Sequence, residues 1–474
     1  MTAVAAPAFE GYGTKSYRAY ALLLLTVVYT FNFVDRGLIG ITQEALKHDL
    51  GVDDFQLGVL GGPVFAILYT LLGVPIARFA ERSNRITIVT IGAAVWSLMT
   101  AVCGLAANYM QLVVARVGVG IGEAACTPPS QSVLTDYYPS ARRATALAIY
   151  ALGIPIGTMI SAFVGGWLVA HGGDLFSWLA PMFNALGIRN NLGDGAEIAG
   201  WRTVFLALGL PGLIAAFILK TTVREPPRSG AAKETPSFSA TLRAIAGKRS
   251  FWHIAVAGAL MSFVGYSTAQ FLVSYSVRNY GVSISQASSA LGIVAGVSVA
   301  LGTFSGGFLA DRLSRRFPSI PAWLPGAGIL VALPVYLLAF GAPDFNTAFM
   351  FLLIAPVFHY LYLGPMYAVS QSIVEPRMRA TTVAILLLIV NLIGYGLGPP
   401  TLGALSDFLA NRELTSAGLT VAQCKAPGVE HPGACAPALA HGLRFAMMGV
   451  TCLLAWPMIH FFLAARHYLK DRVS

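Results

Sequence analysis

Twelve stretches of predominantly apolar residues follow one another along the 474-residue chain. Each is at least about 20 residues long, the length at which an α-helix crosses the hydrocarbon core of a bilayer. The stretches occupy residues 18–42, 55–79, 85–106, 109–135, 142–171, 201–221, 251–278, 285–310, 321–341, 345–371, 379–408 and 440–465. We therefore predict an all-α membrane protein with twelve transmembrane helices.

The charge content supports a lipid environment. Only 11% of the residues are charged, whereas soluble domains carry about 25%. The net charge is +10, but the basic residues lie in short gaps between apolar stretches. Nucleic-acid binding needs one clustered basic patch, so we expect the bilayer and not a nucleic acid as partner. The first stretch contains Asp35 and Arg36 and lacks an Ala-x-Ala-like cleavage site, which favours a retained helix over a signal peptide.

The distribution of Lys and Arg predicts the orientation. With the N-terminus inside, inner segments hold 22 of them and outer segments seven, while Arg36 and Arg116 lie within the membrane. Basic residues gather on the cytoplasmic side of membrane proteins, so both termini are expected in the cytoplasm. The chain has no Asn-x-Ser/Thr glycosylation sequence, which favours a bacterial inner membrane.

The longest inner connection, 222–250, divides the twelve helices into two sets of six. The predicted units are a cytoplasmic segment 1–17, a six-helix domain 18–221, the linker 222–250, a six-helix domain 251–465 and a tail 466–474. Short motifs recur six helices apart: Ser-Gln-Ser at 130–132 and 370–372, and Arg-Ala-Thr at 143–145 and 379–381. Such repeats predict two pseudo-symmetric halves with a substrate site between them.

Two outer loops are long. Residues 172–200 have apolar residues at helical spacing, which predicts an amphipathic helix at the interface, serving as a cover or as a substrate gate. Residues 411–437 contain Cys424 and Cys435, for which we predict a disulfide in an oxidising compartment. His431 is the only histidine between the two cysteines, so a zinc site is not expected.

Two inner gaps resemble the Gly-x-x-x-Asp-Arg-x-x-Arg signature of the major facilitator superfamily. The later gap matches it fully, and the earlier one has Ala77 and Glu81 at the Gly and Asp positions. The resemblance implies cytoplasmic gate motifs in which the acid pairs with neighbouring guanidinium groups. Their residues are Glu81, Arg82, Arg85, Gly307, Asp311, Arg312 and Arg315. Residues 116–124 are similar to the family's Arg-centred motif linked with proton coupling, and 153–157 to its glycine/proline motif.

Within that superfamily the chain looks most like the Spinster family. The resemblance rests on residues 29–36 (Tyr-Thr-Phe-Asn-Phe-Val-Asp-Arg) and on Arg116 followed by Gly-Glu-Ala at 122–124. It implies a lysolipid or sphingosine-1-phosphate type of substrate, moved by a proton gradient without a cofactor.

The charges inside the membrane are the candidate coupling residues. Each costs about 2.5–3.5 kcal/mol at a helix centre and persists where it faces a cavity or a partner. We predict that Asp35, Arg116 and Glu123 converge on the central cavity. An arginine that moves toward or away from a carboxylate changes how readily that group binds a proton. We favour Asp35 as the main carrier and Arg116 as its counter-ion; the alternative is a static cluster of ion pairs. Leu363 and Pro356 occupy the equivalent positions of Glu123 and Arg116 in the second half, which favours coupling.

Polar residues near these charges are candidates for the substrate cavity, although each could instead form a helix–helix hydrogen bond. Arg36 could tie its helix to a neighbour or meet an anionic headgroup, and His359 could be a satisfied packing residue. The candidates are Tyr29, Asn32, Arg36, Gln270, His359, Tyr360, Tyr367 and Asn391.

We expect no enzymatic activity, because the chain lacks a Walker loop, His-Glu-x-x-His and Gly-x-Ser-x-Gly. A channel would need a selectivity filter, and a non-transporting receptor or scaffold of the same fold stays open. The sequence favours a monomeric secondary transporter that moves an amphipathic lipid-like solute by proton-coupled alternating access. Its alternatives are drug or organic-anion efflux and uniport.

Overall fold

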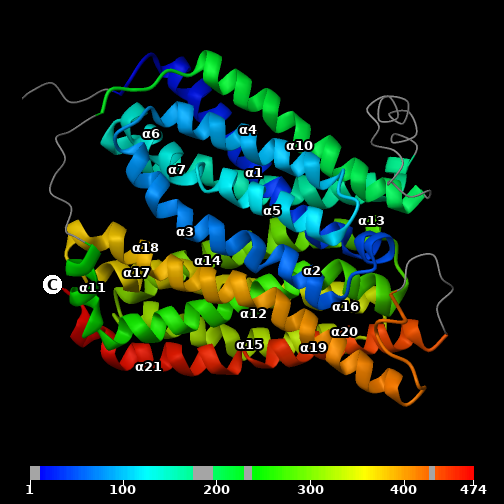
Figure 1. Ribbon diagram of the computed structural model, residues 1–474. Coiled ribbons are helices and arrows are strands. Elements are labelled where there is room, and N and C mark those ends of the chain that lie inside the picture. The colour runs from blue at the N-terminus through cyan, green and yellow to red at the C-terminus, as the bar shows by residue number, and fades with distance from the viewer. Residues whose placement is uncertain (1–10, 174–195, 229–237, 426–432, 474) are drawn as a thin grey trace, which may run out of the picture.

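The computed structural model describes residues 11–173, 196–228, 238–425 and 433–473. Within these ranges the regular elements are helices, most of them running along one common axis (Figure 1). Eleven helices in the described ranges are long and apolar enough to cross a membrane. The predicted amphipathic helix at 172–200 falls mostly outside the described residues.

The first half contains the blue to green helices of Figure 1. Its elements are α1 (Lys15–Leu50), α2 (Asp54–Gly61), α3 (Pro63–Ala80), α4 (Arg85–Cys103), α5 (Tyr109–Glu123), α6 (Thr127–Tyr137), α7 (Ser140–Ala151), α8 (Gly153–Ile160), the π-helical turn η1 (Ser161–Gly165) and α10 (Ala196–Thr222).

The second half follows a short linker helix, α11 (Phe238–Ala246). Its elements are α12 (Arg249–Tyr280), α13 (Ile284–Ile293), η3 (Val294–Ser298), α14 (Val299–Ser314), α15 (Ile320–Gly341), α16 (Phe345–His359), η4 (Tyr360–Tyr362), α17 (Leu363–Ser372), η5 (Pro376–Met378), α18 (Arg379–Ile389), η6 (Val390–Tyr395), α19 (Gly396–Thr415), α20 (Cys435–Cys452) and α21 (Ala455–Asp471).

The two longest helices open the two halves and end in the same way. Helix α1 has 36 residues and α12 has 32, and both extend beyond their predicted ends. Each stops at a glycine in the left-handed conformation, Gly51 with φ 60° and Gly281 with φ 66°. Glycine adopts this conformation without a steric penalty and commonly terminates helices. The shared terminator adds structural support to the repeat found in the sequence.

The fourth predicted span, 109–135, is interrupted. Helix α5 ends at Glu123 and α6 begins at Thr127, directly before Pro128 and Pro129. Prolines have no backbone N–H to donate to the preceding turn, so the continuous helix predicted here was wrong. The two pieces together form the span that completes the twelve. The break places the Glu123 carboxylate at the end of a helix within the bundle.

Glycines bring the fifth span against α1. A Cβ atom at Gly157 would lie 2.4 Å from the carbonyl oxygen of Thr30, and one at Gly153 would lie 3.0 Å from the Tyr29 ring. Small residues at this spacing let membrane helices approach closely. The glycine/proline motif therefore fixes the position of the helix that carries Asp35.

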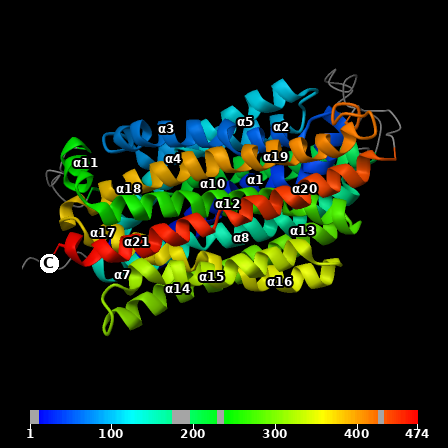
Figure 2. The same cartoon turned by 90° about the horizontal axis from the view of Figure 1, so that it is seen from below.

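The two ends of the bundle differ. We call the end that carries α11 and the C-terminus the linker end, and the opposite end, where Cys424 and Cys435 form the predicted disulfide, the disulfide end (Figure 2). All the ion pairs that join the two halves among the described residues lie at the disulfide end. Among the described residues, ion pairs therefore join the halves at one end only.

The predicted gate motifs lie at the linker end and do not form the expected pairs. Glu81, Arg82, Asp311, Arg312 and Arg315 are exposed, and neither acid forms an ion pair within the described ranges. The prediction that each acid pairs with neighbouring guanidinium groups was therefore wrong for this conformation. In the described ranges no ion pair joins the halves at this end, and these motif side chains are exposed, where a pair of opposite charges gains little.

Candidate functional site

The first of two buried ion pairs joins α1 to α5 near the middle of the bundle. Arg116 Nη1 donates to Asp35 Oδ2 at 2.9 Å, and Thr100 Oγ1 on α4 donates to Asp35 Oδ1 at 2.5 Å. Asp35 is 3% exposed and Arg116 is fully buried. The Asp35 carboxylate is thus held by donors from two other helices.

The second ion pair joins the neighbouring residue of α1 to the end of α5. Arg36 Nε donates to Glu123 Oε2 at 2.8 Å. Adjacent residues point about 100° apart on a helix, whereas residues seven apart share a face. Asp35 and Arg36 therefore meet Arg116 and Glu123 as two separate pairs. We call these four residues the charge cluster; its formal charges cancel.

Aromatic rings enclose Arg36. Its guanidinium carbon lies 4.7 Å from the Phe33 ring centre, 4.9 Å from Phe65 and 4.6 Å from Tyr69. The Arg116 guanidinium also lies over Phe65, at 5.8 Å. Cations bind the faces of aromatic rings. These rings therefore help to hold both cations inside the bundle.

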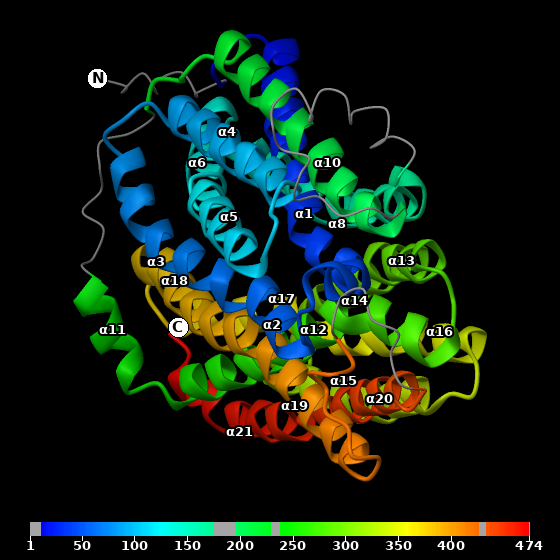
Figure 3. The same cartoon turned by 45° about the vertical axis from the view of Figure 1, so that its right-hand side comes forward.

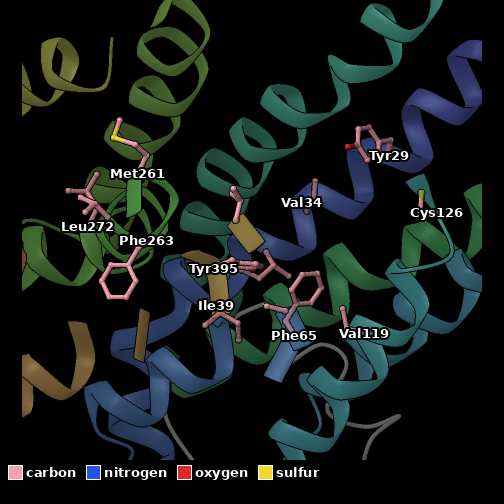
Figure 4. Close-up of a cluster of buried hydrophobic side chains, with 14 of the residues drawn as sticks. Tyr29, Val34, Ile39, Phe65, Val119, Cys126, Met261, Phe263, Leu272 and Tyr395 are labelled. Atoms are coloured by element: carbon pink, nitrogen blue, oxygen red, sulfur yellow. The ribbon is translucent and has the colours of Figure 1, made fainter. Parts of the chain in front are cut away.

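Rings of the second half reach this site. The Tyr395 ring on η6 lies beside the Phe65 ring (Figure 4), with ring centres 5.5 Å apart, and the ring centre of Tyr266 on α12 lies 4.4 Å from that of Tyr395. Tyr266 is 40% exposed although its ring adjoins this contact between the halves. The Arg36 side chain is 15% exposed, against none for Glu123. The open side of the charge cluster therefore belongs to Arg36 and borders the second half.

Several buried polar atoms of the site have no hydrogen-bond partner among the described residues. They are Arg116 Nε and Nη2, Glu123 Oε1, and both amide atoms of Asn32. Buried polar groups without a partner are costly and uncommon in folded proteins. Helices α1 and α5 thus carry buried hydrogen-bond donors and acceptors that have no partner among the described residues.

The other predicted cavity residues are spread over the molecule. Tyr29 stacks on Tyr150 with ring centres 4.3 Å apart. Gln270 lies toward the disulfide end, where its Nε2 donates to Leu57 O at 2.9 Å. His359 is 1% exposed, with Nε2 3.2 Å from Met261 O, as a packing residue would be.

Tyr360 is half-buried, and its ring lies 4.9 Å from that of His359. Tyr367 and Asn391 are also half-buried. Of the cavity candidates, Arg36 is the residue that bonds directly to the predicted coupling residues.

A second polar cluster, which sequence reasoning missed, closes the disulfide end. The fully buried Asp54 carboxylate accepts from Arg278 at 2.7 and 2.8 Å and from Ser406 Oγ at 2.7 Å, both in the second half. Lys47 Nζ, 2.9 Å away, adds a cation from the first half. Arg278 Nε also donates to Glu44 Oε1 at 2.9 Å. We call Glu44, Lys47, Asp54, Arg278 and Ser406 the clamp.

The start of α2 is held further by the second half. Asp407 accepts from the backbone N–H of Phe55 at 2.8 Å and of Asp54 at 3.3 Å, and Lys425 Nζ donates to Asp53 Oδ2 at 2.8 Å. A carboxylate is favourable at a helix N-terminus, where backbone N–H groups lack partners. Asp407 thus caps a helix of the opposite half.

At the linker end, Arg85 binds two carboxylates that precede the second half. It is 3% exposed and donates to Asp136 at 2.5 Å and to Glu225 at 2.6 Å. The predicted gate residue therefore ties α4 to α6 and to the start of the linker. Within the described residues no group of three or more His, Cys, Asp or Glu could hold a metal ion.

Comparison with known proteins agrees with this geometry. The family model of the Major Facilitator Superfamily matches residues 25–399. The chain is 31% identical over 402 residues to an MFS-type efflux pump of Mycolicibacterium smegmatis, covering 83% of this chain and 86% of the pump. It is 23% identical over 434 residues to a probable sphingolipid transporter, spinster homolog 2, of Arabidopsis thaliana, covering 84% and 83% of the two chains.

Among solved structures, a bacterial homologue of the human lysosomal transporter Spinster, in an inward-facing and unoccupied conformation, is 41% identical. It aligns with a TM-score of 0.88 over 98% of this chain and 100% of the homologue.

Proposed function

The chain belongs to the major facilitator superfamily and groups with its bacterial Spinster homologues, and on this premise we propose that it is a proton-coupled secondary transporter of an amphipathic, lipid-like solute. The charge cluster carries the proposal. It places two carboxylates and two guanidinium groups in a bundle whose other central residues are mostly apolar or aromatic.

Proton coupling follows from the charge balance of this cluster. A proton on Asp35 or Glu123 leaves one guanidinium group without its counter-ion, and an unpaired buried charge costs about 3–5 kcal/mol. The cost falls if a helix moves to give that cation another partner, or if an anionic group binds. Protonation, helix position and solute binding are thereby linked without covalent chemistry.

The exposure of the two arginines suggests the order in which a solute would reach the charge cluster. Arg36 is the more exposed cation, so an anionic headgroup between the halves meets it first and competes with Glu123. Arg116 and Asp35 lie deeper and are disturbed afterwards. We retain Asp35 as the main proton carrier, because its counter-ion Arg116 and its donor Thr100 lie on two other helices, so a movement of either helix changes how readily Asp35 binds a proton.

Alternating access is supported by the contrast between the two ends. The clamp closes the disulfide end, while no ion pair of the described residues joins the halves at the linker end. With the linker end in the cytoplasm of a bacterial inner membrane, as its basic residues favour, this conformation faces inward. Transport then requires the clamp to open.

The proposed substrate class rests on the arrangement of charged and aromatic side chains and on the names of two relatives. Two cations beside aromatic rings suit a headgroup with negative charge and an attached apolar chain. The relative named a probable sphingolipid transporter supports a lysophospholipid or sphingoid phosphate. The relative named an efflux pump favours a second candidate, proton-coupled export of a drug or organic anion.

The test is uptake into liposomes of a labelled lysophospholipid under an imposed pH gradient, with a cationic dye as the competing substrate. We expect gradient-dependent lysophospholipid uptake that Asp35→Asn abolishes. Glu413→Gln, which changes an exposed carboxylate, should behave as the unaltered protein does. Equal uptake by the protein and Asp35→Asn would remove Asp35 from the mechanism. Movement of the dye alone would favour drug efflux.

A further inference from the structure

The linker helix α11 has one face on the protein and one apolar face turned away from it. Thr241 and Ile245 are fully buried, and the helix contacts α18. Phe238 is 50% exposed and Leu242, one turn later, is 38% exposed. Large apolar side chains that recur at this spacing on an exposed face need a partner other than water.

The apolar face continues onto α12. Trp252 is 41% exposed, and its indole Nε1 donates to the carbonyl oxygen of Ala246, the last residue of α11, at 3.2 Å. Ala246 follows Leu242 by one turn and is exposed too. Phe238, Leu242, Ala246 and Trp252 therefore form one continuous strip, which we call the linker strip.

Two arginines flank the linker strip. Arg243 follows Leu242 directly, and Arg249 precedes Trp252 by three residues, which puts it on the same side of α12. Both are exposed and form no ion pair within the described residues. The nearby acid Asp471 accepts from the backbone N–H and hydroxyl of Ser250, at 2.8 and 2.7 Å. The surface around the strip is thus positively charged.

The helix lies across the bundle instead of along it. In Figures 1 and 3, α11 stands at the linker end with its axis across the long helices. A helix in this position, with apolar residues on its free face and arginines beside them, suits the surface of a bilayer. Tryptophan is also enriched at the depth of the lipid headgroups.

We infer that the linker strip with Arg243 and Arg249 is a binding surface for anionic phospholipid headgroups of the leaflet at the linker end. The strip inserts among the acyl chains, and the two guanidinium groups bind headgroup phosphates. The contact anchors the connection between the halves beside α18. It needs no transport activity, so it stands apart from the function proposed above.

Trp252 provides a direct test with the full-length protein. We would reconstitute the chain in bilayers of phosphatidylglycerol and phosphatidylcholine, with bromine on the acyl chains of only one of them. The Trp252 signal is the difference in fluorescence between the protein and Trp252→Phe. We expect brominated phosphatidylglycerol to quench this signal more than brominated phosphatidylcholine at equal fractions.

Substitution of the two arginines distinguishes their binding to headgroups from the insertion of the apolar linker strip among the acyl chains. In an Arg243→Gln/Arg249→Gln variant the preference for phosphatidylglycerol should fall, by up to about 5-fold per arginine at low salt. Quenching by phosphatidylcholine should persist, because the apolar strip is unchanged. Arg316→Gln, an exposed arginine of a different connection, should keep the preference. Equal quenching by both lipids in the unaltered protein, or a Trp252 signal that neither lipid quenches, would overturn the inference.

Discussion

At the scale of single residues, the two carboxylates of the charge cluster have different environments. Asp35 has two donors, from Arg116 and Thr100, whereas among the described residues Glu123 has one donor and a free Oε1. More donors therefore hold the Asp35 carboxylate than the Glu123 carboxylate. Glu123 has room for a proton on Oε1 beside the more exposed Arg36.

Thr100 offers a test of this difference. In Thr100→Val, Asp35 loses one donor to its charged form and binds a proton more readily. A hydrogen bond to a charged group contributes about 1.5–3 kcal/mol, so we expect the pH profile of transport to shift upward by about one to two units. Thr90→Val, whose hydroxyl donates to Ile86 of its own helix, is the matched control. An unshifted profile in Thr100→Val would contradict the role of this donor.

The sequence revealed these charges because ionisable groups are rare in apolar spans. It predicted Arg116 as the counter-ion of Asp35, which the structure confirms, but it did not predict that Arg36 pairs with Glu123. Asp35 and Arg36 are neighbours on α1, so the rotation of this helix, which packs on Gly157, decides which helix each side chain faces. Thr100 and Phe65 are ordinary residues of an apolar span, and nothing in their local sequence distinguishes them from helix-packing residues.

At the scale of elements, α2 of the first half packs closely against α19 of the second half. A Cβ atom at Gly58 would lie 2.5 Å from Pro399 O on α19, and one at Gly403 would lie 2.1 Å from Asp54 O. Side chains cannot fit at such distances, so the backbones of α2 and α19 touch. The prolines and glycines of residues 396–403 form this contact surface at the disulfide end.

A single methyl group tests this contact. Gly58→Ala should separate α2 from α19 and favour opening of the disulfide end, seen as a longer distance between spin labels on the two halves there. Gly73→Ala, on α3 with open space around the new methyl group, should leave the distance unchanged. An equal distance in both variants would show that the close approach does not limit opening.

Helix number and order were predictable because apolar length is a direct signal of a membrane span. The break after Glu123 was not predicted, although Pro128 and Pro129 were visible, because membrane helices often tolerate proline. The length of α1 was underestimated, since polar and charged residues become frequent after residue 42. Glu44 and Lys47 among them belong to the clamp, where Arg278 binds Glu44 and Asp54 binds Lys47.

At the scale of the whole molecule, the clamp determines which end is closed. Arg278 reaches both Asp54 and Glu44 across the boundary between the halves. It is thus the principal ionic contact from the second half to the first. Opening the disulfide end requires these bonds to break together.

Removing Arg278 should therefore shift the population toward opening. In Arg278→Gln, Asp54 keeps Lys47 and Ser406 but loses its cationic partner in the second half, and loss of one member of a buried ion pair costs about 3–5 kcal/mol. Spin-label distances across the disulfide end should lengthen. Arg444→Gln, which removes hydrogen bonds to Phe340 and Gly341 within the second half, should not lengthen them. Unchanged distances in Arg278→Gln would show that other contacts close this end.

The division into two halves was predictable from the repeated motifs, but the conformation was not. In the proposed alternating-access cycle, one sequence must form both an inward-facing and an outward-facing state. We therefore expect each gate to contain residues that pair in only one of these two states. Among the described residues, Asp311 and Arg312 form no ion pair, while Asp54 and Arg278 are paired. Lys47 and Arg278 were visible as charges on the predicted outer side, and only their contacts across the halves identify them as a gate.

Coupled proton movement tests the central claim most directly. We would load liposomes containing the protein with a pH-sensitive dye, impose no gradient, add lysophospholipid and record the internal pH. We predict a substrate-dependent pH change that disappears in Asp35→Asn. Lysophospholipid uptake without any pH change would contradict proton coupling and identify the protein as a uniporter.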